Sequence, residues 1–303
     1  MSSALSTAPA TAAQTTRPEI VTAVVTPFDR RGELDLPAFR TLVEHVAPHV
    51  DSVFVGGTTG EFPAMDAAER IDITLAALDL LDASRTIAHI GAASARQAKE
   101  LLVPLRAAGV FRFAALTPYY LSASADGVRR YYGELLETLG AGAELYVYIF
   151  PEVAGTDVDV EQLAALKELG AAGVKISGGA SARVLQYAPL ISDEFRLWSG
   201  NDADLPRVAS VHGTGTVSGV SGVAPQAFSM LADALADEPD GVADRQRVVA
   251  GLVAALGPSI ARLKYGLELL GLPGGSTRMP IDAPEPAVRQ QVSAALTAAG
   301  LLD

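Results

Sequence analysis

The sequence predicts an α/β protein, a (β/α)8 TIM barrel with a C-terminal helical appendage. Short apolar runs alternate with helical patterns about eight times within the 303 residues. Short links between a strand and the next helix require parallel strands with right-handed crossovers, and eight such units close into a barrel. An open doubly wound sheet is the alternative. That fold favours a glycine-rich turn after its first strand, whereas here the first strand runs into Thr26, Pro27 and Phe28.

The predicted strands are short, mostly apolar runs that end near glycine, proline or hydroxyl residues, as expected of parallel strands buried on both faces. They cover residues 20–28, 52–55, 86–90, 111–116, 145–150, 171–176, 195–198 and 214–217. The helices between them have apolar residues at helical spacing. They cover residues 39–49, 67–81, 94–107, 125–139, 160–169, 182–188, 205–211 and 225–236. Beyond residue 240 the strand signals stop, and helical patterns cover residues 242–256, 259–270 and 286–301.

This pattern divides the chain into three parts. Residues 1–17 are rich in Ser, Ala and Thr and carry no charge before Arg17, which predicts a disordered tail, with an organelle transit peptide as the alternative. Residues 18–238 form the predicted catalytic barrel, and residues 239–303 form the predicted C-terminal helical domain. No apolar core of signal-peptide length follows the start of the sequence, and no run of about 18 apolar residues occurs anywhere in it. We therefore expect a cytoplasmic protein without a membrane partner.

Composition excludes several classes of function. The net charge of −12 and the isoelectric point near 4.8 disfavour binding to nucleic acid, which needs a basic surface, and to anionic membranes. The absence of cysteine excludes disulfides, thiolate metal sites and a cysteine nucleophile, and it fits an intracellular enzyme. A hydrophobic content of 49% is ample for a large core.

Lys175 is the leading candidate for chemistry. It lies near the end of the apolar run 171–176, which Ser177, Gly178 and Gly179 close. Active sites of barrels lie at the carboxyl ends of the strands, and burial there favours the neutral amine, a nucleophile. Such an amine attacks a ketone or aldehyde to form an imine. The alternative is a lysine that extends from a strand end to solvent or pairs with a carboxylate.

Other strand ends carry polar residues too. Residues 56–61 (Gly-Gly-Thr-Thr-Gly-Glu) follow the second strand, and their backbone N–H groups and hydroxyls suit a small carboxylate or phosphate, although an ordinary turn is the alternative. The alternation of a strand places Tyr148 on the same face as Tyr146 and Phe150. Tyr148 is therefore a candidate proton relay beside Lys175, and an aromatic core layer is the alternative. Tyr120 follows the fourth strand, where packing is the default role.

Together, these residues suit the binding of a 2-oxo acid while a lysine attacks its carbonyl. The protonated imine then acts as an electron sink, so that an enamine supports formation or cleavage of a C–C bond. A catalytically weak 2-oxo-acid-binding protein is one alternative. A phosphate-binding barrel enzyme that uses the glycine run at residues 213–219 is another, although we interpret this run as a tight loop around the eighth strand.

The four histidines do not predict a metal site. His45 and His49 have the spacing of two ligands on one helix face, but Pro48 indicates that the helix is ending there, and no third ligand is near in sequence. His89 and His212 are isolated. We interpret all four as surface or packing residues.

Ordered motifs along most of the chain resemble those of the dihydrodipicolinate synthase / N-acetylneuraminate lyase family of class I aldolases. They lie at residues 24–28, 56–61, 117–120, 148–151, 173–175, 199–202, 215–219 and 269–275. The resemblance implies that Lys175 is the Schiff-base lysine and that Tyr148 is the proton-relay tyrosine, hydrogen-bonded to Thr58. It also implies that Thr58 and Thr59 hold the carboxylate of a pyruvate-type substrate.

The same resemblance implies two further roles and an assembly. Tyr120 would be lent by one subunit to the active site of its neighbour, and the backbone carbonyl of Val217 would lie near the lysine amine. The family resemblance implies a homotetramer built as a dimer of dimers, without a metal or an organic cofactor.

Departures from the synthase pattern affect the second substrate. Ile149 and Val153 stand where synthases usually have asparagine and a carboxylate-binding arginine, and a valine cannot make that bidentate contact. Ala95 and Lys99 replace residues typical of lysine-inhibited synthases, so we expect no lysine feedback. We therefore predict weak or absent condensation with aspartate semialdehyde. A 4-hydroxy-tetrahydrodipicolinate synthase remains an alternative, as does a 2-keto-3-deoxy sugar-acid aldolase or dehydratase, which the stretch 60–62 favours.

Overall fold

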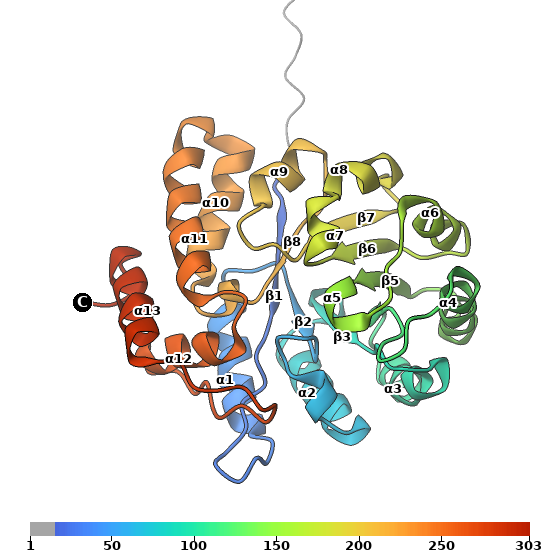
Figure 1. Ribbon diagram of the computed structural model, residues 1–303, viewed down its shortest axis with the longest axis horizontal. Helices are drawn as coiled ribbons and strands as arrows, with labels where there is room; N and C mark the ends of the chain where they lie inside the picture. The colour runs from blue at the N-terminus through green and yellow to red at the C-terminus, as the bar shows by residue number, and fades with distance from the viewer. Residues whose placement is uncertain (1–15) are drawn as a thin grey trace, which may run out of the picture.

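Eight parallel strands close into a barrel in chain order, which confirms the predicted (β/α)8 fold (Figure 1). The structure, a computed structural model, describes residues 16–303. The strands are β1 (Glu19–Ala23), β2 (Ser52–Val55), β3 (Thr86–His89), β4 (Arg112–Leu116), β5 (Glu144–Ile149), β6 (Gly173–Ile176), β7 (Arg196–Ser199) and β8 (Gly215–Ser218). The barrel helices are α1 (Leu36–Val46), α2 (Ala67–Leu80), α3 (Ala95–Ala107), α4 (Ala125–Leu139), α5 (Pro151–Ala154), α6 (Val160–Glu168), α7 (Gly179–Ala182), α8 (Val184–Tyr187), α9 (Leu205–Ser210) and α10 (Pro225–Asp237).

Three more helices follow the barrel, as predicted: α11 (Val242–Leu256), α12 (Ile260–Leu269) and α13 (Pro286–Ala298). Figure 1 shows them gathered on one side of the barrel next to α10. Position 238 as the boundary between barrel and helical domain stays a prediction.

The structure departs from the predicted elements in three places. The helix predicted over residues 182–188 is two short helices, α7 and α8, because Arg183 between them has a non-helical backbone (φ −95°, ψ 16°). The short helix α5 directly after β5 was not predicted. The first strand ends at Ala23, and Phe28 instead forms isolated bridges with Leu34 and Ser276. Pro27 lacks the N–H that a ladder continued to Phe28 would need.

Side-chain caps explain where several helices begin. Asp66 and Asp159 each accept a hydrogen bond from the backbone N–H three residues on, and the Glu69 and Gln162 side chains accept one in return. These capping boxes satisfy N–H groups that have no partner inside the helix. Asp35, Ser94 and Ser124 cap α1, α3 and α4 in the same way without the reciprocal bond. The sequence therefore fixes these helix starts locally.

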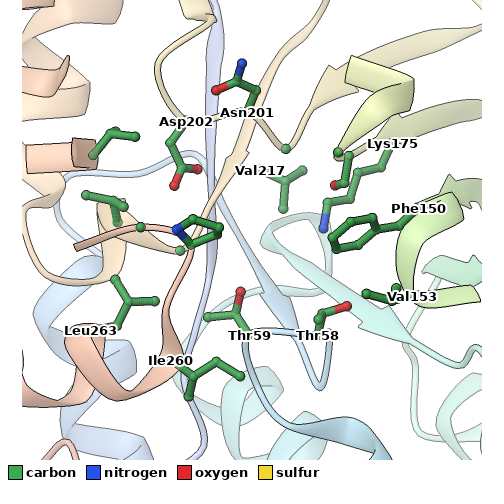
Figure 2. A pocket seen from close by; sticks show the side chains of 18 of the residues that line it. Thr58, Thr59, Phe150, Val153, Lys175, Asn201, Asp202, Val217, Ile260 and Leu263 are labelled. Carbon is green, nitrogen blue, oxygen red and sulfur yellow. The ribbon is translucent and has the colours of Figure 1, made fainter. Parts of the chain in front are cut away.

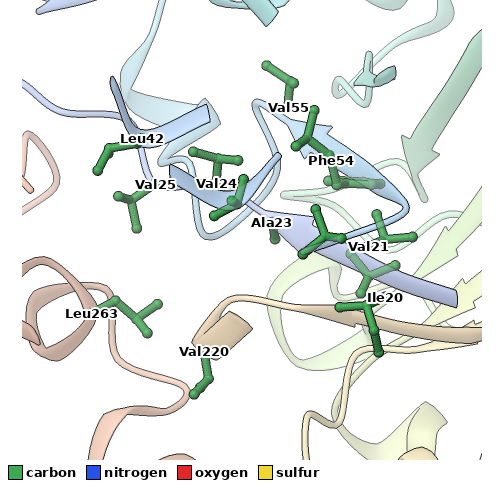
Figure 3. Packing of buried hydrophobic residues seen from close by; sticks show 14 of the residues in the cluster. Ile20, Val21, Ala23, Val24, Val25, Leu42, Phe54, Val55, Val220 and Leu263 are labelled. Atoms are coloured by element: carbon green, nitrogen blue, oxygen red, sulfur yellow. The ribbon is translucent and has the colours of Figure 1, made fainter. Parts of the chain in front are cut away.

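The barrel interior is filled by large side chains in register. Strand pairing aligns Leu116 with Tyr148, Tyr148 with Lys175, and Lys175 with Trp198. Tyr146 lies two residues nearer the amino end of β5 than Tyr148, and its ring meets that of Trp198 edge to face with the ring centres 4.9 Å apart. Figure 3 shows the apolar cluster around β1, where Leu263 of α12 belongs to the same core as the barrel residues Val25 and Leu42.

A polar cluster closes the barrel at the amino ends of its strands. Arg112 donates hydrogen bonds to the hydroxyls of Tyr146 (3.1 Å) and Ser52 (2.9 Å). The Glu144 carboxylate accepts hydrogen bonds from Tyr146 and Arg196. This end is therefore plugged, and the carboxyl ends of the strands are left to form a site.

A buried ion pair joins the C-terminal helices to the loop after β2. The Lys264 amine of α12 donates to Glu61 Oε1 (2.6 Å), to Thr26 O (2.8 Å) and to Ser276 O (2.6 Å). Both side chains are almost fully buried. Glu61 Oε2 accepts from the backbone N–H groups of Arg278 and Met279 at 2.9 and 2.8 Å. The pair fixes α12 beside the loop at residues 56–61, the candidate site for a small carboxylate.

Most of the predicted disordered tail, residues 1–15, lies outside the described residues. Arg17, at the end of that predicted segment, forms ion pairs with Asp51 and Asp233. Within residues 16–303, no single helix has the length and apolar composition needed to cross a membrane. One bent pair, Pro239–Leu256 with Ile260–Leu269 at 112°, passes that test on length and composition alone.

Candidate active site at the carboxyl ends of the strands

A cavity of about 460 Å³ opens at the carboxyl ends of the barrel strands (Figure 2). This is the end at which barrel enzymes carry their active sites, and the volume lies within the range of small-molecule sites. Several strand ends and the C-terminal helices contribute to its wall. The side chains that line it include Thr58, Thr59, Tyr148, Phe150, Val153, Lys175, Ser177, Asn201, Asp202, Val217, Val253, Ile260 and Leu263.

Lys175 extends from β6 into this cavity and is 6% exposed. Its amine lies 3.9 Å from the centre of the Tyr148 ring and 4.5 Å from that of Phe54. In the described part of the chain, no carboxylate forms an ion pair with this amine, in contrast to Lys264 and its partner Glu61. Of the two sequence interpretations, the lysine paired with a carboxylate therefore lacks support. A buried amine that faces a cavity is placed to attack a bound carbonyl.

Tyr148 lies beside Lys175 on the neighbouring strand β5, and its hydroxyl is 3.2 Å from Thr58 Oγ1. Lys175, Tyr148 and Thr58, which the sequence analysis grouped, therefore lie together. The Tyr148 ring packs edge-on against Phe54 (6.0 Å) and His89 (5.9 Å), which fixes its position. The hydrogen bond to Thr58 links this phenol to the loop after β2.

That loop is held from beneath by hydrogen bonds to its backbone. Thr26 donates its hydroxyl to Gly60 O (2.8 Å), and His89 Nδ1 lies 2.8 Å from Gly56 O. Gly56 and Glu61 both have left-handed backbone angles, φ 64° and 57°, which gives the loop its tight turn. Thr58 and Thr59 consequently line the cavity. The loop geometry suits a small carboxylate.

His89 is a buried packing residue, which agrees with its sequence interpretation. Its ring accepts a hydrogen bond from Leu116 N–H at Nε2 (3.3 Å), so that Nδ1 carries the proton and donates to Gly56 O. Burial, and then the charge of Arg70, hold the pKa of His89 well below its usual value. His89 is therefore a neutral support beneath Tyr148 and the loop.

Asp202 is a site residue that the sequence reasoning did not single out. Burial raises the pKa of its carboxyl to about 6, against hydrogen bonds from Ser218 and the Val220 N–H and the charge of Lys175. Its Oδ1 has no hydrogen-bond partner within the described residues. Lys175 was identified as a polar residue at the carboxyl end of a strand. Asp202 and its neighbour Asn201 could have been found in the same way, because both follow the end of β7.

The remaining predicted site residues are distributed unevenly. Val217 of β8 lines the cavity near Lys175, and Val153 of α5 lines it at the rim with 46% exposure. Tyr120 does not line the cavity. It is 90% exposed and has a left-handed backbone, φ 79°. This single chain thus brings Lys175, Tyr148, Thr58, Thr59 and Val217 together and leaves Tyr120 outside.

Residues 213–219 support the structural interpretation of their glycine run. Gly215 lies in β8, where a Cβ would come within 1.9 Å of Glu19 O on β1, so a glycine is required by the barrel itself. At Gly213 a Cβ would meet Val208 at 2.5 Å. Across the described chain, no group of three or more His, Cys, Asp or Glu residues is arranged to hold a metal ion.

The C-terminal helices form the side of the cavity that sequence reasoning missed. Val253 of α11 and Ile260 and Leu263 of α12 line it. Figure 2 shows Ile260 and Leu263 across the cavity from Phe150 and Val153. No local signal marks these residues, because apolar positions on a helix are ordinarily core.

Comparisons with known proteins agree with this geometry. A family model described as the dihydrodipicolinate synthetase family matches residues 17–299. A 4-hydroxy-tetrahydrodipicolinate synthase of Nitrobacter hamburgensis is 32% identical over 289 residues, covering 93% of this chain and 96% of that protein. The enzyme of the same name from Escherichia coli K12 is 29% identical over 294 residues, covering 93% and 98%. A solved structure described as DHDPS from Cyanidioschyzon merolae with lysine bound aligns with a TM-score of 0.87 at 26% identity, covering 94% of this chain and 99% of that one.

Proposed function

The chain belongs to the dihydrodipicolinate synthetase family, and from this membership we propose that Lys175 forms a Schiff base with pyruvate or a related 2-oxo acid. The family places it among lyases of the Schiff-base aldolase type. The observation that carries the assignment to Lys175 is a buried amine that faces a cavity beside the Tyr148 ring and forms no ion pair with a carboxylate of residues 16–303.

In the proposed reaction, the threonines of the loop, Lys175 and Tyr148 have separate roles. The carboxylate of the 2-oxo acid binds at Thr58 and Thr59, and the Lys175 amine attacks the C2 carbonyl. Tyr148 passes protons to the former carbonyl oxygen, which leaves as water, and the iminium forms. Loss of a C3 proton, or cleavage of the C3–C4 bond, delivers its electron pair to the iminium and gives the enamine. Addition of the enamine to an aldehyde followed by hydrolysis completes the cycle.

The oligomeric site is a second part of the proposal. Tyr120 is exposed and has a left-handed backbone, a conformation that costs on the order of 1 kcal/mol or more in a non-glycine residue. Strain of this kind is typically retained where the residue has a function. We propose that Tyr120 contributes to the active site of a neighbouring subunit in a homotetramer built as a dimer of dimers. We also propose a cytoplasmic location and activity without a metal or organic cofactor.

The second substrate separates two candidate functions. The names of the relatives favour a 4-hydroxy-tetrahydrodipicolinate synthase, which condenses pyruvate with aspartate semialdehyde. Against it, Val153 at the cavity rim and Ile149 in β5 offer no cation to a second carboxylate. We therefore propose an aldehyde other than aspartate semialdehyde. A sugar-acid aldolase or dehydratase is the remaining alternative, favoured by the polar side chains of Ser177, Asn201 and Asp202 in the wall.

The test is reductive trapping. The protein is incubated with pyruvate and borohydride, digested, and the adduct is located by mass spectrometry. We expect a reduced adduct on Lys175, and none in Lys175→Met. Tyr148→Phe keeps the ring packing, and we expect it to trap roughly 100-fold more slowly or worse, in line with the usual worth of general acid–base catalysis. An adduct confined to other lysines, such as the half-buried Lys99, would overturn the assignment.

A further inference from the structure

Charge is the first constraint on what binds next to the enamine. Among the residues that line the cavity, Lys175 is the only lysine or arginine, and its nitrogen carries no charge once the enamine has formed. Besides Lys175 and Tyr148, the only ionisable side chain among these lining residues is the acidic Asp202. A substrate tail with a carboxylate or phosphate would thus lie in a buried space with no counter-ion and beside a carboxyl group, which is unfavourable.

Apolar surface is the second constraint. Phe150 and Val153 form one side of the cavity, and Val253, Ile260 and Leu263 line the side supplied by the C-terminal helices. A chain of hydroxyls against these walls would lose hydrogen bonds to water without replacement. Apart from Thr58, Thr59 and Tyr148, the uncharged or acidic polar side chains of the lining are Ser177, Asn201 and Asp202. None of them belongs to α11 or α12, so a hydroxylated chain along that wall would find no side-chain partner there.

Size is the third constraint. A three-carbon 2-oxo acid at Thr58, Thr59 and Lys175 occupies one end of a cavity of about 460 Å³. The rest extends toward the α11–α12 wall, where Figure 2 shows Ile260 and Leu263 on the far side from Lys175. The space beyond the reacting carbon is therefore both large and mainly apolar.

We infer that the carbonyl partner is an uncharged aldehyde whose alkyl or aryl group lies between Phe150 and the wall formed by Val253, Ile260 and Leu263. This rests on the proposed Schiff-base function and specifies its second substrate. The enamine carbon of pyruvate forms a bond to the aldehyde carbon, and the aldehyde oxygen takes a proton through Tyr148. Hydrolysis of the iminium then releases a 4-hydroxy-2-oxo acid with an apolar substituent, so that pyruvate and aldehyde add without loss of any other group.

The test compares aldehydes with the same enzyme and pyruvate. Benzaldehyde and hexanal represent the apolar class, and aspartate semialdehyde and glyceraldehyde represent the charged and hydroxylated classes. Product formation is followed by mass spectrometry of the 4-hydroxy-2-oxo acid. We expect kcat/KM for the apolar aldehydes to exceed that for the other two by at least roughly 10-fold, the discrimination that a single methylene gives in an apolar pocket.

A matched pair of variants on α11 tests the wall itself. Val253→Asn places an amide in the cavity wall, and we expect it to lower kcat/KM for hexanal by roughly 10-fold or more while borohydride trapping of pyruvate keeps its rate. Val248→Asn makes the same change on α11 at a site outside this cavity, 40% exposed, and serves as the control.

The outcomes separate the two proposals. Failure to trap pyruvate on Lys175 overturns the Schiff-base function and the apolar partner with it. Normal trapping with a preference for aspartate semialdehyde or glyceraldehyde, or with an unchanged hexanal reaction in Val253→Asn, overturns only the apolar partner.

Discussion

Replacing Lys264 with methionine removes the cation of the ion pair buried between the loop after β2 and α12. The amine donates three hydrogen bonds of 2.6 to 2.8 Å, and its loss leaves the Glu61 carboxylate and the carbonyls of Thr26 and Ser276 without that donor. Breaking a buried ion pair from one side costs about 3–5 kcal/mol, because the remaining charge is uncompensated. Glu61 keeps two backbone N–H donors at its other oxygen, so we expect the lower end of that range.

The assay is denaturant unfolding of wild type, Lys264→Met and the double variant Lys264→Met/Glu61→Gln at equal protein concentration. We expect the double variant to regain part of the lost free energy of unfolding, because the neutral amide leaves no buried charge while its oxygen still accepts from the N–H groups of Arg278 and Met279. We also expect a raised Kd for pyruvate in Lys264→Met, since Glu61 ends the loop that carries Thr58. A loss below about 1 kcal/mol, or a double variant less stable than the single one, would refute the reasoning.

Two further predictions concern pH. Because the pKa of His89 is held well below its usual value, the unfolded chain binds a proton below about pH 6.5 that the folded chain does not. The free energy of unfolding should therefore fall with pH below that point, by at most about 1.4 kcal/mol per unit from this residue, and His89→Gln should show a flatter slope than wild type. The Asp202 carboxyl has the opposite effect on how stability depends on pH, since its pKa is raised from 3.8 to about 6. The stability that it contributes is present below pH 4 and is lost as pH rises through 6. Relative to Asp202→Asn, wild type should lose up to roughly 3 kcal/mol between pH 4 and 7, and parallel profiles for the two proteins would contradict the raised pKa.

Much of the fold was predictable because barrel elements are encoded locally. Parallel strands buried on both faces appear as apolar runs, and cap residues such as Asp66 and Ser94 mark where helices begin. The non-helical backbone of Arg183 and the bridge between Phe28 and Ser276 were not predictable, because neither leaves a pattern in the neighbouring sequence.

The sequence by itself predicted which residues make up the candidate site of this protein. Lys175 at the end of an apolar run, Tyr148 one strand earlier and two threonines in a glycine-rich turn occupy strand ends, and the closure of a parallel barrel brings all strand ends to one edge. Only the tertiary structure decided what surrounds that group. Val253 and Ile260 have the pattern of ordinary core residues, and they face the cavity because the Lys264–Glu61 ion pair and the apolar core hold the C-terminal helices against the barrel. Such packing joins residues far apart in the chain, so no local pattern records it.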